Sequence, residues 1–358
     1  MSWRPLLDGA IADRARAAID EVAERLARPA EAASLVGAAG RALLLSYLER
    51  TEAADRHLDA AFDAVGGLGP TLFDGLAGVA FALAQLGHDI DASVDAGLAR
   101  CLGPGLHHDL ILGVSGIGVY ALERWPDSAT LLSAVIAWLD DHARPAEVGR
   151  YLFSEPHWID ASRQHASGVI DLGVAHGQGA AIAIAASAAA LGVPAARCLY
   201  DDLTAHLWSH AVADRDYRFP AVAGATEPNR SAWCYGDPGL AAALWAAATR
   251  VGDRAASERA ASLARFAAAR PSSATQVETS GFCHGAIGLA HVYNRIAQAT
   301  GDDALAVAAR AWYERALAMP LPDQLDLLDG QLGIGLALHA ATSSDEPMWD
   351  RAFAISVR

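Results

Sequence analysis

The sequence predicts an all-α protein in which pairs of helices close into an α/α barrel. The chain has 358 residues, of which 53% are apolar, and alanine, the strongest helix former, contributes the largest share. A pair of closely spaced glycines recurs seven times, each time directly ahead of an apolar run. The alternation of apolar and polar residues that is typical of strands appears only in short, rare stretches.

The glycine repeat is the main evidence for this fold. Its first glycines are 38, 38, 64, 59, 49 and 45 residues apart, so each unit has room for two helices and two turns. The pairs are Gly37 and Gly40, Gly75 and Gly78, Gly113 and Gly116, Gly177 and Gly179, Gly236 and Gly239, Gly285 and Gly288, and Gly330 and Gly333. The apolar runs that follow them span 41–48, 79–86, 117–124, 180–191, 240–248, 289–297 and 334–341.

Glycine suits the start of such a helix for two reasons. It tolerates an unusual φ in a tight entry turn, and it leaves space in a crowded inner ring where a Cβ would not fit. Repeated helix pairs can form an open rod or a closed ring, and the chemically informative residues favour the ring because all of them lie on the glycine turns. We expect a single domain over residues 1–358, with a loop or small insertion at 140–168 and a second non-helical connection at 214–230.

Composition and charge exclude several classes of protein. The net charge of −15 argues against nucleic-acid binding by charge attraction. All 27 basic residues are arginine, so neither a Schiff-base lysine nor a P-loop lysine is available. Four cysteines in a chain of this length do not resemble a disulfide framework. The sequence shows neither a secretory signal nor a run long enough to span a bilayer, so we expect a soluble, cytoplasmic protein with no transmembrane segment.

Two glycine turns carry a candidate metal site. Cys234 lies just ahead of the fifth glycine pair, and Cys283 and His284 lie just ahead of the sixth. Two thiolates and one imidazole are a suitable zinc ligand set, and three protein ligands leave a fourth position open for chemistry. A substrate thiolate in that position would stay both deprotonated and nucleophilic. The alternative is that both cysteines act as small buried hydrophobic residues beside a hydrogen-bonded core histidine.

The repeat, together with three motifs, resembles the lanthionine synthetase C-like family of lanthipeptide cyclases. The motifs are Trp233-Cys-Tyr-Gly, Cys283-His-Gly and Leu172-Gly-Val-Ala-His-Gly, and the likeness extends over about 34–340. The resemblance implies a toroid of seven inner and seven outer helices with one Zn²⁺ per chain, held by Cys234, Cys283 and His284. It also implies that a peptide cysteine thiol adds to dehydroalanine or dehydrobutyrine and closes a thioether ring.

Four further residues are candidates for catalysis, and three of them, His176, Asp109 and Arg230, match the family's pattern. His176 would protonate the enolate or accept the thiol proton, and the alternative is a core histidine. Asp109 would orient His176, or would instead cap a helix. Arg230 would stabilise the enolate oxygen, or would be an ordinary surface arginine. Tyr235 would donate a hydrogen bond near the metal, or simply pack.

Three other histidines are weaker candidates for the functional site. His107 and His108 sit beside Asp109, but adjacent histidines on a loop are usually solvated. His291 is more typical of a core residue. The fourth glycine pair departs from the pattern because its second glycine is displaced by one residue, and this leaves the turn after His176 undefined.

These features together predict a stand-alone, zinc-dependent lanthionine cyclase. Its expected partners are a dehydrated precursor peptide with its leader, and a dehydratase and transporter that form a complex with it. Three alternatives stay open: addition of glutathione to dehydroamino acids, a non-catalytic peptide-binding scaffold, and an α/α-barrel carbohydrate hydrolase. The hydrolase needs paired carboxylates across a cleft, for which the turns offer little beyond Asp109 and Asp237.

Overall fold

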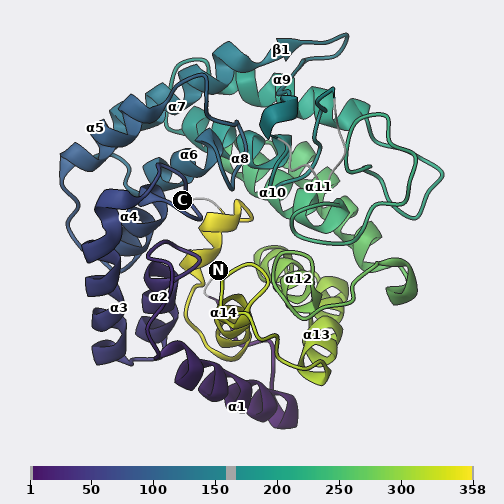
Figure 1. The fold of residues 1–358 in the computed structure, drawn as a ribbon. Coiled ribbons are helices and arrows are strands. Elements are labelled where there is room, and N and C mark those ends of the chain that lie inside the picture. Colours follow the sequence, from purple (N-terminus) through teal and green to yellow (C-terminus); the bar gives the residue numbers. More distant parts are fainter. Residues whose placement is uncertain (1–2, 159–166, 357–358) are drawn as a thin grey trace.

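The structure is a computed structural model that describes residues 3–158 and 167–356, and its helices form a double ring (Figure 1). Among these residues, inner and outer helices alternate along the chain, which confirms the predicted all-α toroid. The inner helices are α2 (Ala38–Tyr47), α4 (Leu76–Gln85), α6 (Val114–Glu123), α8 (Gln178–Ala190), α10 (Asp237–Arg250), α12 (Ala286–Thr300) and α14 (Gln331–Thr342). The outer helices are α1 (Gly9–Leu26), α3 (Thr51–Ala64), α5 (Ala92–Cys101), α7 (Ala129–His142), α9 (Ala196–Ser209), α11 (Arg254–Ala268) and α13 (Asp303–Ala318).

The inner ring is closed. Each inner helix contacts the next one along the chain, and α14 contacts α2. Inner helices are apolar on almost every side because they pack against an outer helix, two neighbours and the centre of the barrel. In α8, for example, every residue of 178–188 is buried. Outer helices such as α11 bury one stripe only and are amphipathic as a result.

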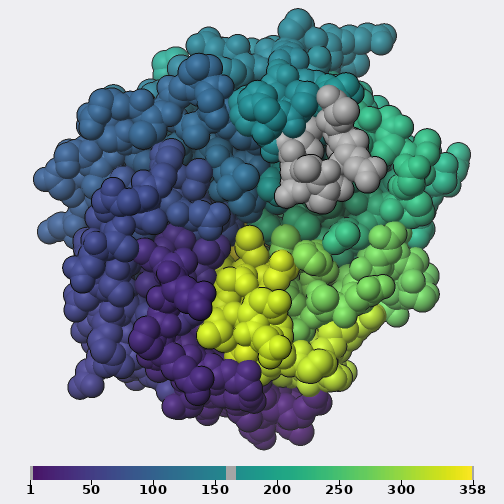
Figure 2. Space-filling model, viewed as in Figure 1, coloured from purple at the N-terminus to yellow at the C-terminus, as the bar shows by residue number. Residues whose placement is uncertain are grey.

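The C-terminal segment fills the centre of the ring (Figures 1 and 2). It contains the short helix η5 (Met348–Phe353), whose Phe353 ring lies 4.1 Å from the ring of Phe282. The indole of Trp233 is fully buried and donates a hydrogen bond of 2.8 Å to the carbonyl oxygen of Phe353. Trp233 is therefore a packing residue, and the barrel has a solid aromatic core rather than a pore.

Two reasons were expected for glycine at the start of the inner helices, an unusual φ and a close approach of the backbone, and the structure separates them. The first glycine of every pair is the N-cap of an inner helix, and Gly177 caps α8 in the same way as the other six. Only Gly236 has a positive φ, +104°, so the prediction of unusual φ angles is wrong for the other six. A Cβ on any of the seven would meet a backbone atom of the preceding loop at 2.0–2.5 Å. Close backbone approach is therefore what requires glycine.

The entry loops of the inner helices also bond to one another, which brings them together at one end of the barrel. Backbone hydrogen bonds of 2.8–3.3 Å join most neighbouring loops. They run from Val36 to Phe73, Leu110 to Ala175, Val174 to Cys234, Cys234 to Cys283, and Cys283 to Leu328. The chemically informative residues on these loops are consequently near neighbours.

The connection between α7 and α8 contains a small hairpin that the sequence pattern did not reveal. Strands β1 (Arg144–Pro145) and β2 (Arg150–Tyr151) pair antiparallel, and the short helix η2 (Pro156–Trp158) follows them. Helix α7 extends three residues, 140–142, into the region expected to be a loop, and 159–166 lie outside the described residues. The remaining short helices are η1 (Val65–Gly67) and η4 (Ser272–Ala274). None of the helices in the described parts of the chain is long and apolar enough to cross a membrane.

Replacing Gly40 with alanine should destabilise the fold. A Cβ there would lie 2.0 Å from the Leu35 carbonyl oxygen and 2.8 Å from Leu332 Cδ2. We expect Gly40→Ala to lower the free energy of unfolding by about 1–3 kcal/mol, measured by urea denaturation. Gly66→Ala is the matched control, because a Cβ at Gly66 meets no atom within 4 Å. Equal stability of the two variants would contradict the close-approach explanation.

Candidate metal centre and catalytic residues

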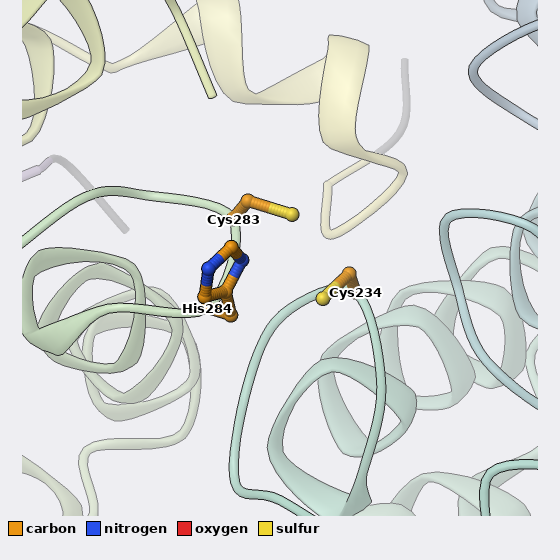
Figure 3. A group of neighbouring side chains, drawn as sticks. All are labelled: Cys234, Cys283 and His284. Atoms are coloured by element: carbon orange, nitrogen blue, oxygen red, sulfur yellow. The ribbon is translucent and has the colours of Figure 1, made fainter. Parts of the chain in front are cut away.

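The three predicted metal ligands come together at the entry loops of α10 and α12. The ligand atoms of Cys234, Cys283 and His284 all lie within 4.8 Å of one another. Figure 3 shows the three side chains converging on the space between the two loops. The backbone N–H of Cys234 donates to the carbonyl oxygen of Cys283 at 3.3 Å, so the loops are held together beside the cluster.

The chemistry of these donors fits a zinc ion. Tetrahedral zinc takes thiolate sulfur at about 2.3 Å and imidazole nitrogen at about 2.0–2.1 Å, so its ligand atoms lie about 3.5–3.8 Å apart. The three ligand atoms, which lie within 4.8 Å of one another, would have to move only slightly closer to reach this separation. Hydrogen bonding from Cys283, aided by His284, lowers the pKa of Cys234 despite its burial, whereas the pKa of Cys283 is raised by its bond to Cys234 and by burial. A cation would let both sulfurs be thiolates.

His176 and Asp109 form a pair beside this cluster. His176 Nδ1 lies 2.6 Å from Asp109 Oδ2, and the imidazole is about a third exposed while the carboxylate is buried. The other carboxylate oxygen, Oδ1, accepts the backbone N–H of Leu112 at 2.7 Å. Asp109 does not cap α6, whose N-cap is Gly113. The geometry therefore matches the alternative in which Asp109 orients His176.

Burial and hydrogen bonds act in opposite directions on Asp109. Burial alone would raise the pKa of the carboxyl group, but hydrogen bonds from His107 and His176 outweigh this effect and hold the pKa well below its ordinary range. The carboxylate is therefore the form that the folded protein favours.

The expectation that His107 and His108 are solvated is wrong, because both side chains are buried. His107 Nδ1 lies 3.1 Å from the same Asp109 Oδ2 that contacts His176. Burial and the nearby His107 keep the pKa of His108 well below its usual value. His291 is a core residue, as expected, with Nε2 2.9 Å from Asp350 Oδ2.

Three of the four predicted catalytic residues and all three metal ligands line a common cleft of about 560 Å³. Of the predicted residues, only the buried Asp109 is absent from its wall, and it contacts the cleft through His176. Arg230 lies on the wall, and its charge contributes to the lowered pKa of Cys234. The lining residues are His176, Ala221, Val222, Ala225, Glu227, Pro228, Asn229, Arg230, Cys234, Tyr235, Gln276, Cys283 and His284.

Two carboxylates beside the site, Asp171 and Asp329, were not predicted from the sequence. The hydroxyl of Tyr235 donates to Asp171 Oδ2 at 2.5 Å, so Tyr235 is held by a hydrogen bond to another loop rather than simply packed. Asp329 Oδ1 lies 3.4 Å from His284 Nδ1. Their signal in the sequence is position: Asp171 directly precedes the Leu-Gly-Val-Ala-His-Gly motif, and Asp329 directly precedes Gly330.

The protein is thus a closed α/α toroid with a Cys₂His cluster at the entry loops of its inner ring. The model of the lanthionine synthetase C-like protein family matches residues 28–354. The chain therefore belongs to the lanthionine synthetase C-like family.

Comparison with solved structures supports the same fold. The chain is similar to a protein named nisin cyclase, with a TM-score of 0.78 over 96% of this chain and 97% of that one. The two sequences are 18% identical, so the likeness establishes the fold alone. A comparison with curated protein sequences gave no match.

Asp109→Asn should destabilise the protein in a pH-dependent way. Because the folded state favours the Asp109 carboxylate, its stabilisation is complete above the ordinary carboxyl pKa of about 4 and is lost as the pH falls below it. We expect the variant to be less stable by roughly 3 kcal/mol near pH 7, with a smaller gap near pH 3 in urea denaturation. Asp13→Asn, at a solvated carboxylate, should change stability little at either pH. A gap for Asp109→Asn that widens in acid would contradict this account.

Proposed function

We propose that the protein is a zinc-dependent lanthionine cyclase. It would add cysteine thiols of a dehydrated precursor peptide to dehydroalanine or dehydrobutyrine, forming lanthionine and methyllanthionine rings. The observation that carries the proposal is the Cys234, Cys283 and His284 cluster in one cleft with the paired His176. Membership of the lanthionine synthetase C-like family supports the same chemistry.

The metal ligands would be the two cysteines and His284, with one Zn²⁺ per chain. When bound, zinc would keep a substrate cysteine as a nucleophilic thiolate at neutral pH. Asp329, 3.4 Å from His284 Nδ1, would help to orient the imidazole, as carboxylates beside metal-ligating histidines commonly do.

His176 would manage the protons of the reaction. The thiol sulfur bonds to the β-carbon of the dehydro residue, the π electrons move onto the carbonyl as an enolate, and the α-carbon then takes a proton. Asp109 holds Nδ1 of His176, so Nε2 is the nitrogen that would accept the thiol proton and deliver a proton to the α-carbon. The reaction needs no oxidant, because the proton lost by sulfur balances the one gained by carbon.

Two further cleft residues, Arg230 and Tyr235, would contribute to the site in different ways. Arg230 would stabilise the enolate oxygen through charge-assisted hydrogen bonds. Tyr235, held by Asp171, would form part of the wall beside the thiol. The proposed partners are the dehydrated, leader-bearing precursor peptide and the dehydratase that prepares it, together with a transporter, and we propose that these steps take place in the cytoplasm.

The metal proposal predicts about one zinc ion per chain in purified protein, measured by inductively coupled plasma mass spectrometry. Cys283→Ala should remove most of this zinc because it leaves only two protein ligands. Cys198→Ala is the control, since Cys198 is an exposed cysteine away from the cluster, and it should keep its zinc. Full zinc content in Cys283→Ala protein would contradict the ligand assignment.

The catalytic proposal predicts that His176→Phe lowers the rate of ring formation by about 10²–10⁴-fold while zinc is retained. The assay is mass spectrometry of precursor peptide after thiol alkylation, because each closed ring removes one alkylation site. His88→Gln, at an exposed histidine, should leave the rate unchanged.

The same assay separates the alternatives. If added glutathione gives only an intermolecular adduct and no ring forms, the function is glutathione addition rather than cyclisation. Rings that still form in Cys234→Ala protein would point to a scaffold whose partner performs the chemistry.

A further inference from the structure

Arg230 has an exposed side chain on a backbone that is held from several sides. The side chain lies on the wall of the cleft, whereas both neighbours along the chain, Asn229 and Ser231, are buried. An arginine side chain has many rotamers, so the space that its guanidinium can reach depends on how firmly the backbone beneath it is fixed. The contacts of that backbone therefore bear on what Arg230 can do in the cleft.

The side-chain amide of Asn229 uses both of its polar atoms to hold this backbone. Its Oδ1 accepts the Arg230 N–H at 2.9 Å, and its Nδ2 donates to the carbonyl oxygen of Phe219 at 3.0 Å. The orientation of the amide is fixed by chemistry, because an N–H can only donate and a carbonyl oxygen can only accept. Phe219 is fully buried, and its own N–H donates to Asp237 Oδ1 at 2.9 Å. Asn229 thus ties Arg230 to the first turn of α10.

The segment between α11 and α12 holds the backbone on both sides of Arg230. Arg270 is buried, and its Nη1 donates to the carbonyl oxygen of Asn229 at 2.7 Å. The Ser231 N–H donates to the carbonyl oxygen of Thr275 at 2.9 Å. Both polar atoms of the peptide unit before Arg230 are therefore hydrogen-bonded, and so is the N–H of the unit after it.

The carbonyl oxygen of Arg230 packs against Gly236. A Cβ at position 236 would lie 2.0 Å from this oxygen, and Gly236 is the one first glycine of the seven pairs that has a positive φ. The Arg230 carbonyl therefore takes the space that a side chain at position 236 would need. Because both peptide units beside the Arg230 Cα are fixed, motion of this residue is largely confined to its side chain.

We propose that Asn229 is a positioning residue for Arg230, and that Arg270 holds the same peptide unit from its other side. Asn229 would fix the point on the cleft wall from which the guanidinium projects. A cationic donor that is in place before the reaction stabilises developing negative charge without having to reorganise. This inference rests on the proposed cyclase function, in which Arg230 stabilises the enolate oxygen.

The test uses full-length, zinc-loaded protein and a short synthetic peptide with one cysteine and one dehydroalanine. Asn229→Ala should lower kcat by about tenfold, the effect of losing one positioning hydrogen bond, and leave KM and zinc content unchanged. Arg230→Met should lower kcat by about 10²-fold, since it removes a donor to the developing oxyanion. It keeps every backbone contact of residue 230, so adding Asn229→Ala to it should lower kcat less than twofold further.

Gln298→Ala is the matched control. Gln298 Nε2 also donates to a backbone carbonyl oxygen, that of Arg4 at 2.6 Å, but it lies in the last turn of α12, away from the entry loops. This variant loses a comparable amide-to-carbonyl hydrogen bond and should keep the wild-type kcat. A similar fall in kcat for Gln298→Ala and Asn229→Ala would assign both effects to general loss of stability and overturn the inference.

A second readout is independent of activity. Amide hydrogen–deuterium exchange should show the N–H of residue 230 protected in the wild type and in Arg230→Met, and exchanging about tenfold faster or more in Asn229→Ala. Exchange at residue 230 that does not respond to Asn229→Ala would overturn the inference. An Asn229→Ala kcat within twofold of wild type would do the same, as would full multiplication of the Asn229 and Arg230 losses.

Failure of the proposed function has a different signature. If zinc-loaded wild-type protein closes no ring in the synthetic peptide or in a precursor peptide, the cyclase proposal fails, and exchange at residue 230 then decides the anchoring by Asn229 alone. If rings form but Arg230→Met is as fast as wild type, the cyclase proposal stands without Arg230. That result overturns the inference, because no reacting group is left for Asn229 to position.

Discussion

The inner ring depends on one steric constraint: the backbone of each entry loop passes within contact distance of the glycine that begins the following helix. At all seven positions a Cβ would come within 2.5 Å of a loop backbone atom. The loop therefore folds over the helix N-terminus and can exchange hydrogen bonds with the next loop around the ring. A larger residue would push the loop outward and separate it from its neighbour.

This constraint explains why reactive residues so far apart in the sequence meet. Asp109, His176, Cys234 and Cys283 lie on the entry loops of α6, α8, α10 and α12, which are consecutive around the inner ring. Each loop supplies one to three side chains of the site, and the loop-to-loop hydrogen bonds set their spacing. The metal cluster spans the fifth and sixth loops for this reason, since Cys234 donates its backbone N–H to the Cys283 carbonyl.

The repeat made the architecture and the meeting of the ligands predictable from sequence, because both follow from which turn each residue occupies. Features that depend on contacts between turns were not predictable. His107 and His108 were expected to be solvated, since nothing local shows that they are buried or that Ser154 and Trp158 contact His107. Asp171 escaped notice because its partner, Tyr235, belongs to another loop. The φ of the first glycines was misjudged because a close backbone approach leaves the same sequence signature as a positive φ.

A single pattern links the side chains that were missed to those that were found. Three side chains of the site are each contacted by a carboxylate from a different loop: His176 by Asp109, Tyr235 by Asp171, and His284 by Asp329. A carboxylate on the same loop could orient its partner even in a partly folded chain. One from a neighbouring loop can do so only after the loops have bonded to each other. The orientation of the site is therefore a property of the closed ring, and substitutions that loosen the glycine contacts act on chemistry as well as on stability.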